Sequence, residues 1–382
     1  MHPGAQSNQS LWWLVVVVLG GSTISIVGGR GEVSLTWIGW LVPLLLSSVI
    51  VLFSNDLRIK IRHWALWALV VFFYSVISLN DNALQRGLML LTPLMIAEAS
   101  ARSRYSKSLT VSNILKALAI NEVLIITLLG YEIYIGSVDL DFLATQSIAM
   151  VLYAWIFFHA FLFFNRITYL VFFSAALIIP VMSVSRMATA AALSVIVLNL
   201  APMKARHRLL AVIAGLSLLS VVVLSSSFSA KSGVVGFDGL YQALTSGEIQ
   251  TNGRIAVWQL LGDRIMDAPL FGHGGNSSQP LLRGNLAFDH PHNDWLRLVF
   301  EYGFFGVAVF LISIALQTKD YLSTAGKVND IETIFIIRTA ISLYIPFCIL
   351  MITDNILLYA SFFGGIHFFL LGLCKAKTVR YR

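Results

Sequence analysis

Long apolar runs alternate with short polar connections along almost the whole chain. The runs reach about 17 to 20 residues, enough for a helix to cross the roughly 30 Å of hydrocarbon in a bilayer. This pattern predicts an all-α, polytopic membrane protein of about twelve transmembrane helices. Two of the spans are short and the Pro180–Arg186 junction could be a re-entrant break, so ten to thirteen helices fit the pattern. The spans are expected near residues 11–28, 35–53, 63–79, 87–100, 110–130, 145–164, 167–182, 187–201, 209–227, 303–317, 335–352 and 355–373.

The composition of the chain also indicates that most of its surface faces lipid. Of the 382 residues, 57% are hydrophobic and 12% charged, against roughly 25% charged in a soluble domain. Both cysteines, Cys348 and Cys374, lie in apolar runs, so no disulfide framework or CxxC site is expected. The first apolar run lacks a basic start and a small-residue cleavage site, so we interpret it as a retained helix.

Basic residues gather in alternate connections, which orients the protein. They mark the cytoplasmic side and place both termini in the cytoplasm. The bias explains most of the net charge of +7, and no nucleic-acid partner is inferred from it. The connections in question hold Arg58, Lys60, Arg62, Arg102, Arg104, Lys107, Arg166, Lys204, Arg206, Arg208, Lys319, Lys327, Lys375, Lys377, Arg380 and Arg382. The opposite side holds only Arg30, Arg86 and Arg186 in its short connections.

A large segment on the opposite, external side lies between the ninth and tenth spans, from about residue 228 to residue 302. It is rich in Gly, Ser, Asn, Asp and Arg, and loops of this length are usually functional. The chain is therefore divided into an N-terminal bundle, 1–227, of about nine helices, this loop, 228–302, with short helices, and a C-terminal part, 303–382, with about three helices and a cytoplasmic tail. Within the loop, an amphipathic helix is expected from Arg254 to Met266, ahead of Pro269.

Two external arginines stand at predicted helix starts. Arg254 opens the amphipathic helix, and Arg186 opens the eighth span against the positive-inside bias. A cation in the first turn opposes the helix dipole. Backbone N–H groups at a helix start attract anions, and a guanidinium group can donate two hydrogen bonds to phosphate oxygens. A diphosphate is therefore a suitable ligand for these positions. The alternative is that each arginine meets a lipid headgroup or a surface carboxylate.

A histidine motif precedes the tenth span. In the run from Asp289 to Leu296, Asn293 or Asp294 can cap the following helix, which puts His292 at or just before a helix start that favours a neutral ring, as a general base requires. A structural role for His292 is the alternative. A metal site with His290 is a further one, although the i, i+2 spacing is a weak metal signal.

These motifs together resemble the O-antigen ligase and O-antigen polymerase superfamily of bacterial membrane glycosyltransferases. The resemblance covers most of the chain in architecture and is most specific from Gly253 to Gly306, in "GRIAVW", "PLFGHGG" and "HPHNDWLRLVFEYGFFG". The earlier "SVSRMATAAAL" is similar to the family's external arginine segment. The family implies a GT-C-like arrangement with the active site on the periplasmic face.

The resemblance also implies residue roles. Family members take a glycan from undecaprenyl diphosphate and pass it to an acceptor hydroxyl without a metal. His292 would then be the base, and Arg186 and Arg254 would hold the diphosphate. We expect no metal and no cofactor. Asn293, Asp294, His290 and Glu301 are possible supporting residues, with Asp294 or Glu301 as the acid that orients His292. A loop contact is expected for His273. A solvated face is the expectation for Arg264, Arg283, Arg297 and Lys231, and a contact with an anionic donor or acceptor is the alternative for each.

The resemblance thus implies a glycosyltransferase in contact with membrane lipid. We prefer a ligase-like function with lipid A core as acceptor, although ligase and polymerase need the same donor site and the sequence does not separate them. A polymerase that uses a second lipid-linked glycan as acceptor is the first alternative. A secondary transporter or lipid flippase would use intramembrane charges such as Glu98, Glu122, His159 and Arg338, but most of these stand near span ends and no internal repeat is evident. A scaffold without chemistry would leave the two helix-opening arginines unexplained.

Overall fold

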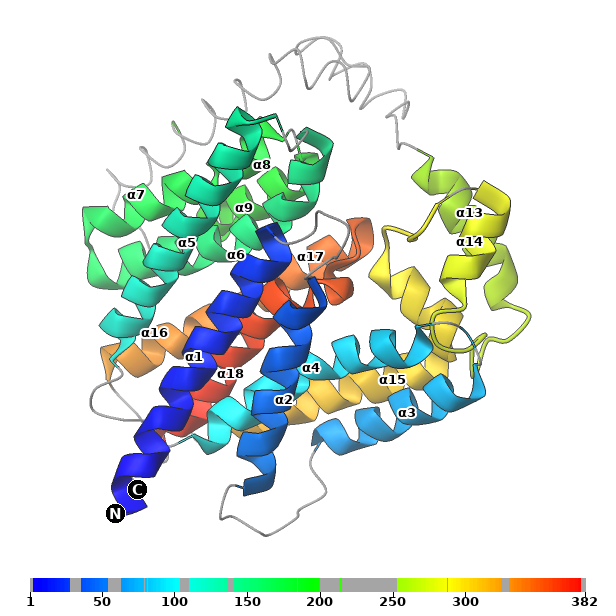
Figure 1. The fold of residues 1–382 in the computed structure, drawn as a ribbon, viewed down its shortest axis with the longest axis horizontal. Coiled ribbons are helices and arrows are strands. Elements are labelled where there is room, and N and C mark those ends of the chain that lie inside the picture. Colours follow the sequence, from blue (N-terminus) through cyan, green and yellow to red (C-terminus); the bar gives the residue numbers. More distant parts are fainter. Residues whose placement is uncertain are drawn as a thin grey trace. The chain divides into compact units, whose positions relative to one another are not determined.

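The fold is described from a computed structural model (Figure 1). The described residues are 3–27, 36–53, 63–78, 80, 82–103, 110–136, 140–183, 185–199, 213, 253–286, 288–323 and 330–378. Every regular element within these ranges is a helix, which confirms the all-α prediction. The elements are α1 (Pro3–Val27), α2 (Thr36–Phe53), α3 (His63–Ile77), α4 (Ala83–Arg102), α5 (Val111–Tyr134), α6 (Leu140–Phe164), α7 (Ile167–Ala176), α8 (Ile178–Met182), α9 (Arg186–Leu198), α13 (Arg254–Ile265), α14 (Ser278–Leu286), α15 (Asp294–Ser323), α16 (Ile331–Ser342), α17 (Tyr344–Thr353), the 3-10 helix η2 (Ile356–Leu358), the π-helix η3 (Ala360–Gly364) and α18 (Gly365–Thr378).

The chain separates into two compact units. The first contains residues 1–129 and 257–382, and the second contains residues 130–256. In the first unit, α4 packs against α2, α3 and α18, and α15 packs against α3. Both α18 and the inner part of α4 are buried on nearly every side, as expected of apolar helices at the centre of a bundle. The first unit therefore has its core around α4 and α18 (Figure 1).

The second unit is organised around α6, which packs against α7, α8 and α9. Trp155 on α6 donates its indole N–H to the carbonyl of Ala191 at 2.8 Å. The hydroxyls of Ser147 and Ser183 lie 2.7 Å apart. These contacts satisfy polar groups inside the unit, where water cannot reach them.

Five described helical segments are long and apolar enough to cross a membrane. Five shorter apolar helices occur as well, within 11–25, 63–77, 167–182, 187–198 and 360–376. The long segments are Thr36–Phe53, Val111–Tyr134, Gln146–Phe164, Asp294–Ser323 and Ile331–Thr353. A multi-pass membrane protein is therefore confirmed, while the number twelve stays a prediction. Apart from residue 213, the predicted ninth span, 209–227, and the start of the external segment lie outside the described residues.

Several predicted spans have a different internal structure. The span predicted at 167–182 is divided into α7 and α8 at Leu177, and the span at 335–352 is divided into α16 and α17 at Leu343. The predicted start of the tenth span at residue 303 coincides with a break at Gly303, which divides α15 into a first part from Asp294 and a second part that forms the span. The last span begins with the irregular η2 and η3, so a long regular helix forms only from Gly365.

Candidate functional site

The loop before α15 holds His292 at the start of that helix. The side-chain carbonyl of Asn293 accepts a hydrogen bond from the Leu296 N–H at 2.9 Å, so Asn293 is the N-cap. His292 is the residue before this cap, as the sequence predicted. Its backbone lies in the left-handed region, with φ of 50°, a conformation that costs a residue with a Cβ roughly 1–2 kcal/mol.

Asn355 and Asp354, from the end of α17, support His292. The His292 backbone N–H donates to the Asn355 side-chain oxygen at 3.0 Å. The His292 Nδ1 atom lies 3.3 Å from the Asn355 amide nitrogen and 3.5 Å from an Asp354 carboxylate oxygen. Nδ1 can accept from the amide in one tautomer or face the carboxylate with its proton in the other. Its other ring nitrogen, Nε2, makes no hydrogen bond to the described residues, and 35% of the side chain is exposed. This leaves Nε2 open to an incoming group.

The two acids expected to orient His292 contact other partners. Asp294 is completely buried, lies 3.0 Å from Arg297 Nη2, and accepts a 2.6 Å hydrogen bond from the Leu357 N–H. Glu301 accepts from the Ser278 hydroxyl at 2.5 Å. Asp294 thus ties η2 to the start of α15, and through η2 it positions the neighbouring Asp354 and Asn355. The acid nearest to the His292 ring is Asp354, which the sequence analysis did not name.

A signal for Asp354 and Asn355 existed in the sequence. They form an isolated polar pair between two apolar runs, on the predicted external side. Intramembrane or interfacial polar pairs of this kind are functional candidates by default. Only the tertiary fold shows that the pair meets the loop before α15.

Backbone hydrogen bonds join the loop after α13, residues 269–274, to residues 300–305 of α15. The N–H groups of His273 and Gly274 donate to the carbonyls of Phe300 and Glu301, and those of Phe304 and Phe305 donate to Pro269 and Leu270, all at 2.9–3.0 Å. At the centre of this contact α15 is interrupted at Gly303, with φ of 64° and ψ of 179°. A Cβ on Gly303 would lie 2.2 Å from the Leu270 oxygen, so only glycine fits. His273 stacks on Phe300 and is a loop contact, as predicted.

α13 and α14 hold the histidine loop from the other side. The Trp258 indole N–H donates to the Pro291 carbonyl at 2.8 Å, directly before His292. Val257 and Leu261 from α13, Leu282 from α14 and Phe300 from α15 form a small apolar core. The predicted amphipathic helix is therefore confirmed and ends at Ile265, before Pro269.

Both predicted anion-binding arginines open helices, as expected. Arg254 is the first residue of α13 and stands one turn before Trp258 on that helix. Arg186 is the first residue of α9. The two belong to the second unit, and their assignment to a diphosphate stays a prediction.

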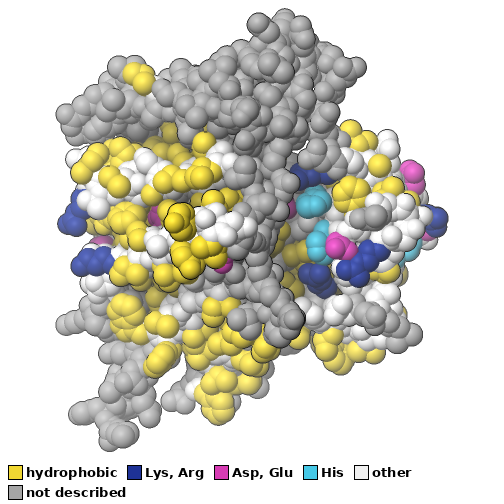
Figure 2. All heavy atoms as spheres, turned by 45° about the horizontal axis from the view of Figure 1, so that its top comes forward, with side chains coloured by type: hydrophobic (Ala, Val, Ile, Leu, Met, Phe, Trp, Pro, Cys, Tyr) yellow, Lys and Arg dark blue, Asp and Glu magenta, His cyan; other side chains and the backbone are white. Residues whose placement is uncertain are grey.

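His290 lies near several basic side chains, and the burial of one of them, Arg297, differs from the prediction. Figure 2 shows histidine and basic side chains gathered next to acidic ones on one face. Burial, together with the charges of Arg86 and Arg297, lowers the pKa of His290 to about 3, so its ring is neutral at neutral pH. Arg297 is only 4% exposed, so the expectation that it lies on a solvated face was wrong. Arg283 is exposed and pairs with Asp289.

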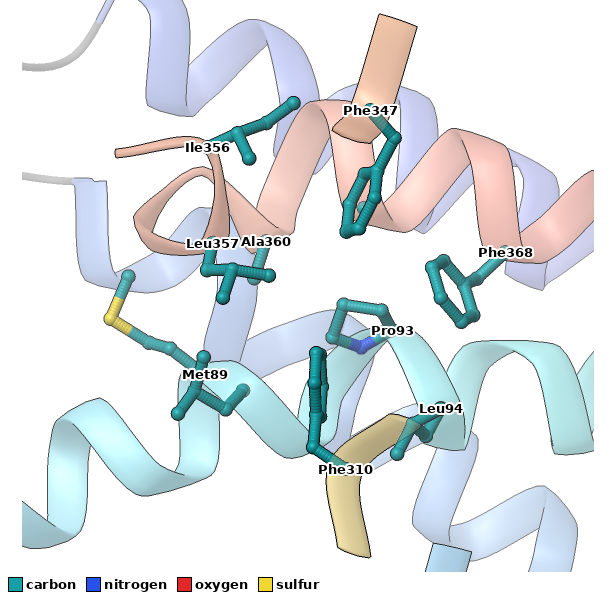
Figure 3. A pocket seen from close by; sticks show the side chains of 11 residues that line it. Met89, Pro93, Leu94, Phe310, Phe347, Ile356, Leu357, Ala360 and Phe368 are labelled. Carbon is teal, nitrogen blue, oxygen red and sulfur yellow. The ribbon is translucent and has the colours of Figure 1, made fainter. Parts of the chain in front are cut away.

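A narrow pocket with apolar walls lies among the helices that follow and precede Asp354 and Asn355 (Figure 3). It is bounded by α4, α15, α17, η2, η3 and α18, and Phe310, Phe347 and Phe368 point into it. Leu357, whose N–H is held by Asp294, forms part of its wall together with Ile356. The lining of the pocket consists of apolar residues and offers no charged or ionisable group.

The fold and the site thus define a helical multi-pass membrane protein. A histidine of the loop before α15 lies directly before the start of that helix. Residues 169–311 match the family model described as O-antigen ligase. This stretch contains Arg186, Arg254 and His292, and it confirms the resemblance to the O-antigen ligase-like superfamily. No curated protein matches the chain. Among the described residues, no group of three or more His, Cys, Asp or Glu side chains could hold a metal ion.

Proposed function

We propose that this membrane enzyme of the O-antigen ligase and polymerase type transfers a glycan from undecaprenyl diphosphate to an acceptor hydroxyl. The acceptor we favour is lipid A core. The single observation that carries the proposal is the presentation of His292 before α15, with Nδ1 beside Asp354 and Asn355 and with Nε2 open. That is the arrangement a general base needs.

In the reacting tautomer the proton is on Nδ1 and faces Asp354. Nε2 takes the proton of the acceptor hydroxyl while the hydroxyl oxygen forms a bond to the anomeric carbon of the donor sugar. The bond between that carbon and the diphosphate oxygen breaks, and the lipid diphosphate leaves with the electron pair. The Asp354 carboxylate then stabilises the imidazolium that has formed.

Negative charge grows on the diphosphate as it leaves. We assign its neutralisation to Arg186 and Arg254, which open α9 and α13. Guanidinium groups and the free N–H groups of helix starts stabilise phosphate oxygens without a metal ion. The proposal places the site on the periplasmic face of the inner membrane, with both termini in the cytoplasm.

The test is turnover of an undecaprenyl-diphosphate glycan by purified protein in EDTA. Wild type should stay active, while His292→Ala, Arg254→Ala and Arg186→Ala should each lose activity although they fold. Arg264→Ala is the matched control, because Arg264 is an exposed arginine at the other end of α13. Full activity of His292→Ala, or loss of wild-type activity in EDTA, would reject the mechanism.

A polymerase would use the same base and the same diphosphate site. Its acceptor would be a second lipid-linked glycan instead of lipid A core. The two functions separate in the product: loss of a ligase abolishes capping of lipopolysaccharide, whereas loss of a polymerase shortens the glycan chains.

A further inference from the structure

Arg86 stands in the first turn of α4, at the edge of the site. The turn before α4 is held against the 274–275 loop, where the Asn80 amide donates to the Gly275 carbonyl at 3.2 Å. The same helix packs against η2, which follows Asp354 and Asn355. Arg86 thus lies just after the turn that contacts the 274–275 loop, on a helix that packs against η2.

Burial and nearby charges shift the pKa of Arg86. Burial lowers the pKa of Arg86, and the charge of Arg297 adds to the effect, while Glu301 and Tyr359 oppose it. A second arginine is thus the charged group with the largest influence on Arg86. Two guanidinium groups close together repel each other unless an anion lies between them.

Three carboxylates of the described residues in this region already have partners. Asp294 lies against Arg297 and the Leu357 N–H, Glu301 accepts from Ser278, and Asp289 pairs with Arg283. The Arg86 guanidinium makes no hydrogen bond or ion pair with the residues that the structure describes. A partly buried charge without a partner is costly, so such a group is usually completed by a ligand or a counter-ion.

Arg297 supplies a second, independent sign of a missing anion. Its side chain is only 5% exposed, yet its Nε–H has no hydrogen-bond partner among the described residues. Its contact with Asp294 is made through Nη2, without the alignment of a hydrogen bond. A buried guanidinium N–H without an acceptor points to an acceptor that a substrate brings.

We propose that Arg86, with Arg297 and His290, forms a subsite for a phosphate group of a substrate, separate from the diphosphate clamp assigned to Arg186 and Arg254. A phosphate oxygen can accept from the Arg86 fork and from Arg297 Nε–H together. The neutral His290 ring can donate one further N–H to the same group. The phosphate belongs either to the lipid-linked donor or to a phosphorylated acceptor. The identity of these two substrates rests on the proposed function, whereas the binding of a phosphate group by Arg86 and Arg297 does not.

The experiment measures binding, so it does not depend on turnover. Full-length protein in nanodiscs is titrated with undecaprenyl diphosphate, and separately with lipid A core before and after enzymatic removal of its phosphates. The variants are Arg86→Gln and the control Arg264→Gln, whose arginine is exposed near Asp267. Arg86→Gln should weaken binding about tenfold or more, since hydrogen bonds to charged groups are the strong ones.

The pattern of weakening identifies the source. Weaker binding of undecaprenyl diphosphate alone assigns the phosphate to the donor. Weaker binding of intact but not of dephosphorylated lipid A core assigns it to the acceptor. Unchanged affinity for every probe would overturn the proposal. Binding that depends on Arg86 in a protein without transferase activity would keep this subsite and reject the proposed function instead.

Stability without ligand gives a second readout. Removal of an unpaired, partly buried charge should leave the melting temperature of the ligand-free protein unchanged or raise it. Arg86→Gln should therefore fold at least as well as wild type. A clear loss of stability, or a failure to fold, would show that Arg86 is a structural residue and would also overturn the proposal.

Discussion

The Nδ1 atom of His292 lies 3.5 Å from a carboxylate oxygen of Asp354. His292 precedes α15, and Asp354 follows α17, so two apolar segments separate the base from its acid along the chain. Asp294 helps to bring the two residues together. One of its carboxylate oxygens lies near Arg297, and the other accepts a hydrogen bond from the Leu357 N–H, just after Asp354 and Asn355. The geometry of the base is therefore built by contacts between segments and not by the histidine motif alone.

Asp354→Asn should lower kcat on the order of 10- to 100-fold, because the amide cannot stabilise the imidazolium formed when His292 takes a proton. KM for the donor should stay the same, since Asp354 makes no contact assigned to donor binding. The measurement is a steady-state comparison with Asp267→Asn, in which an exposed aspartate on the loop after α13 is changed. An unchanged kcat would remove Asp354 from the mechanism.

His292→Gly and His292→Ala should differ in stability although both lose the base. At φ of 50°, glycine is unstrained, whereas alanine keeps a Cβ penalty of roughly 1 kcal/mol. His292→Gly should therefore melt at a higher temperature than His292→Ala. Thermal unfolding in detergent gives the comparison, and the reverse order would argue against the left-handed backbone at this position.

Gly303→Ala should prevent stable folding of the site. The new methyl group would lie 2.2 Å from the Leu270 oxygen and 2.6 Å from the Gly272 nitrogen. Gly262→Ala is the contrasting control, because a Cβ there meets nothing within 4 Å inside α13. That change should raise the free energy of unfolding by about 0.5–1 kcal/mol. Equal effects of the two substitutions on thermal unfolding would contradict the close contact.

His290 should make the protein less stable in mild acid. Its pKa is about 3 in the folded chain and 6.5 in an unfolded one. Below about pH 6.5 the unfolded chain binds a proton that the folded chain does not, so the free energy of unfolding falls towards pH 3 and is flat above pH 6.5. His290→Gln should remove this part of the slope. Melting temperatures at about pH 7.5 and pH 5 test it, and parallel curves for the two proteins would refute it.

Local sequence patterns determined the parts of the site that lie on one short segment. Asn293 caps α15 and puts His292 just before the helix because an Asn ahead of an apolar run is a local helix-start signal. Arg254 opens α13 for the same reason. The lipid-soluble character of the chain also follows from its apolar runs, since their length and composition alone make water an unsuitable solvent.

Only the tertiary structure decided which distant groups meet. The break in α15 at Gly303 comes from its contact with Leu270 and Gly272, which no periodic pattern encodes. Arg297 looks like a surface residue in the sequence, yet it is buried by its contact with Asp294. Asp354 and Asn355 reach the histidine loop because Asp294 holds η2 against the start of α15. A hydrophobic pattern predicts which face of a helix avoids water, but the packing of the whole chain decides which partner covers that face. The same packing decides which polar groups at the helix ends come together.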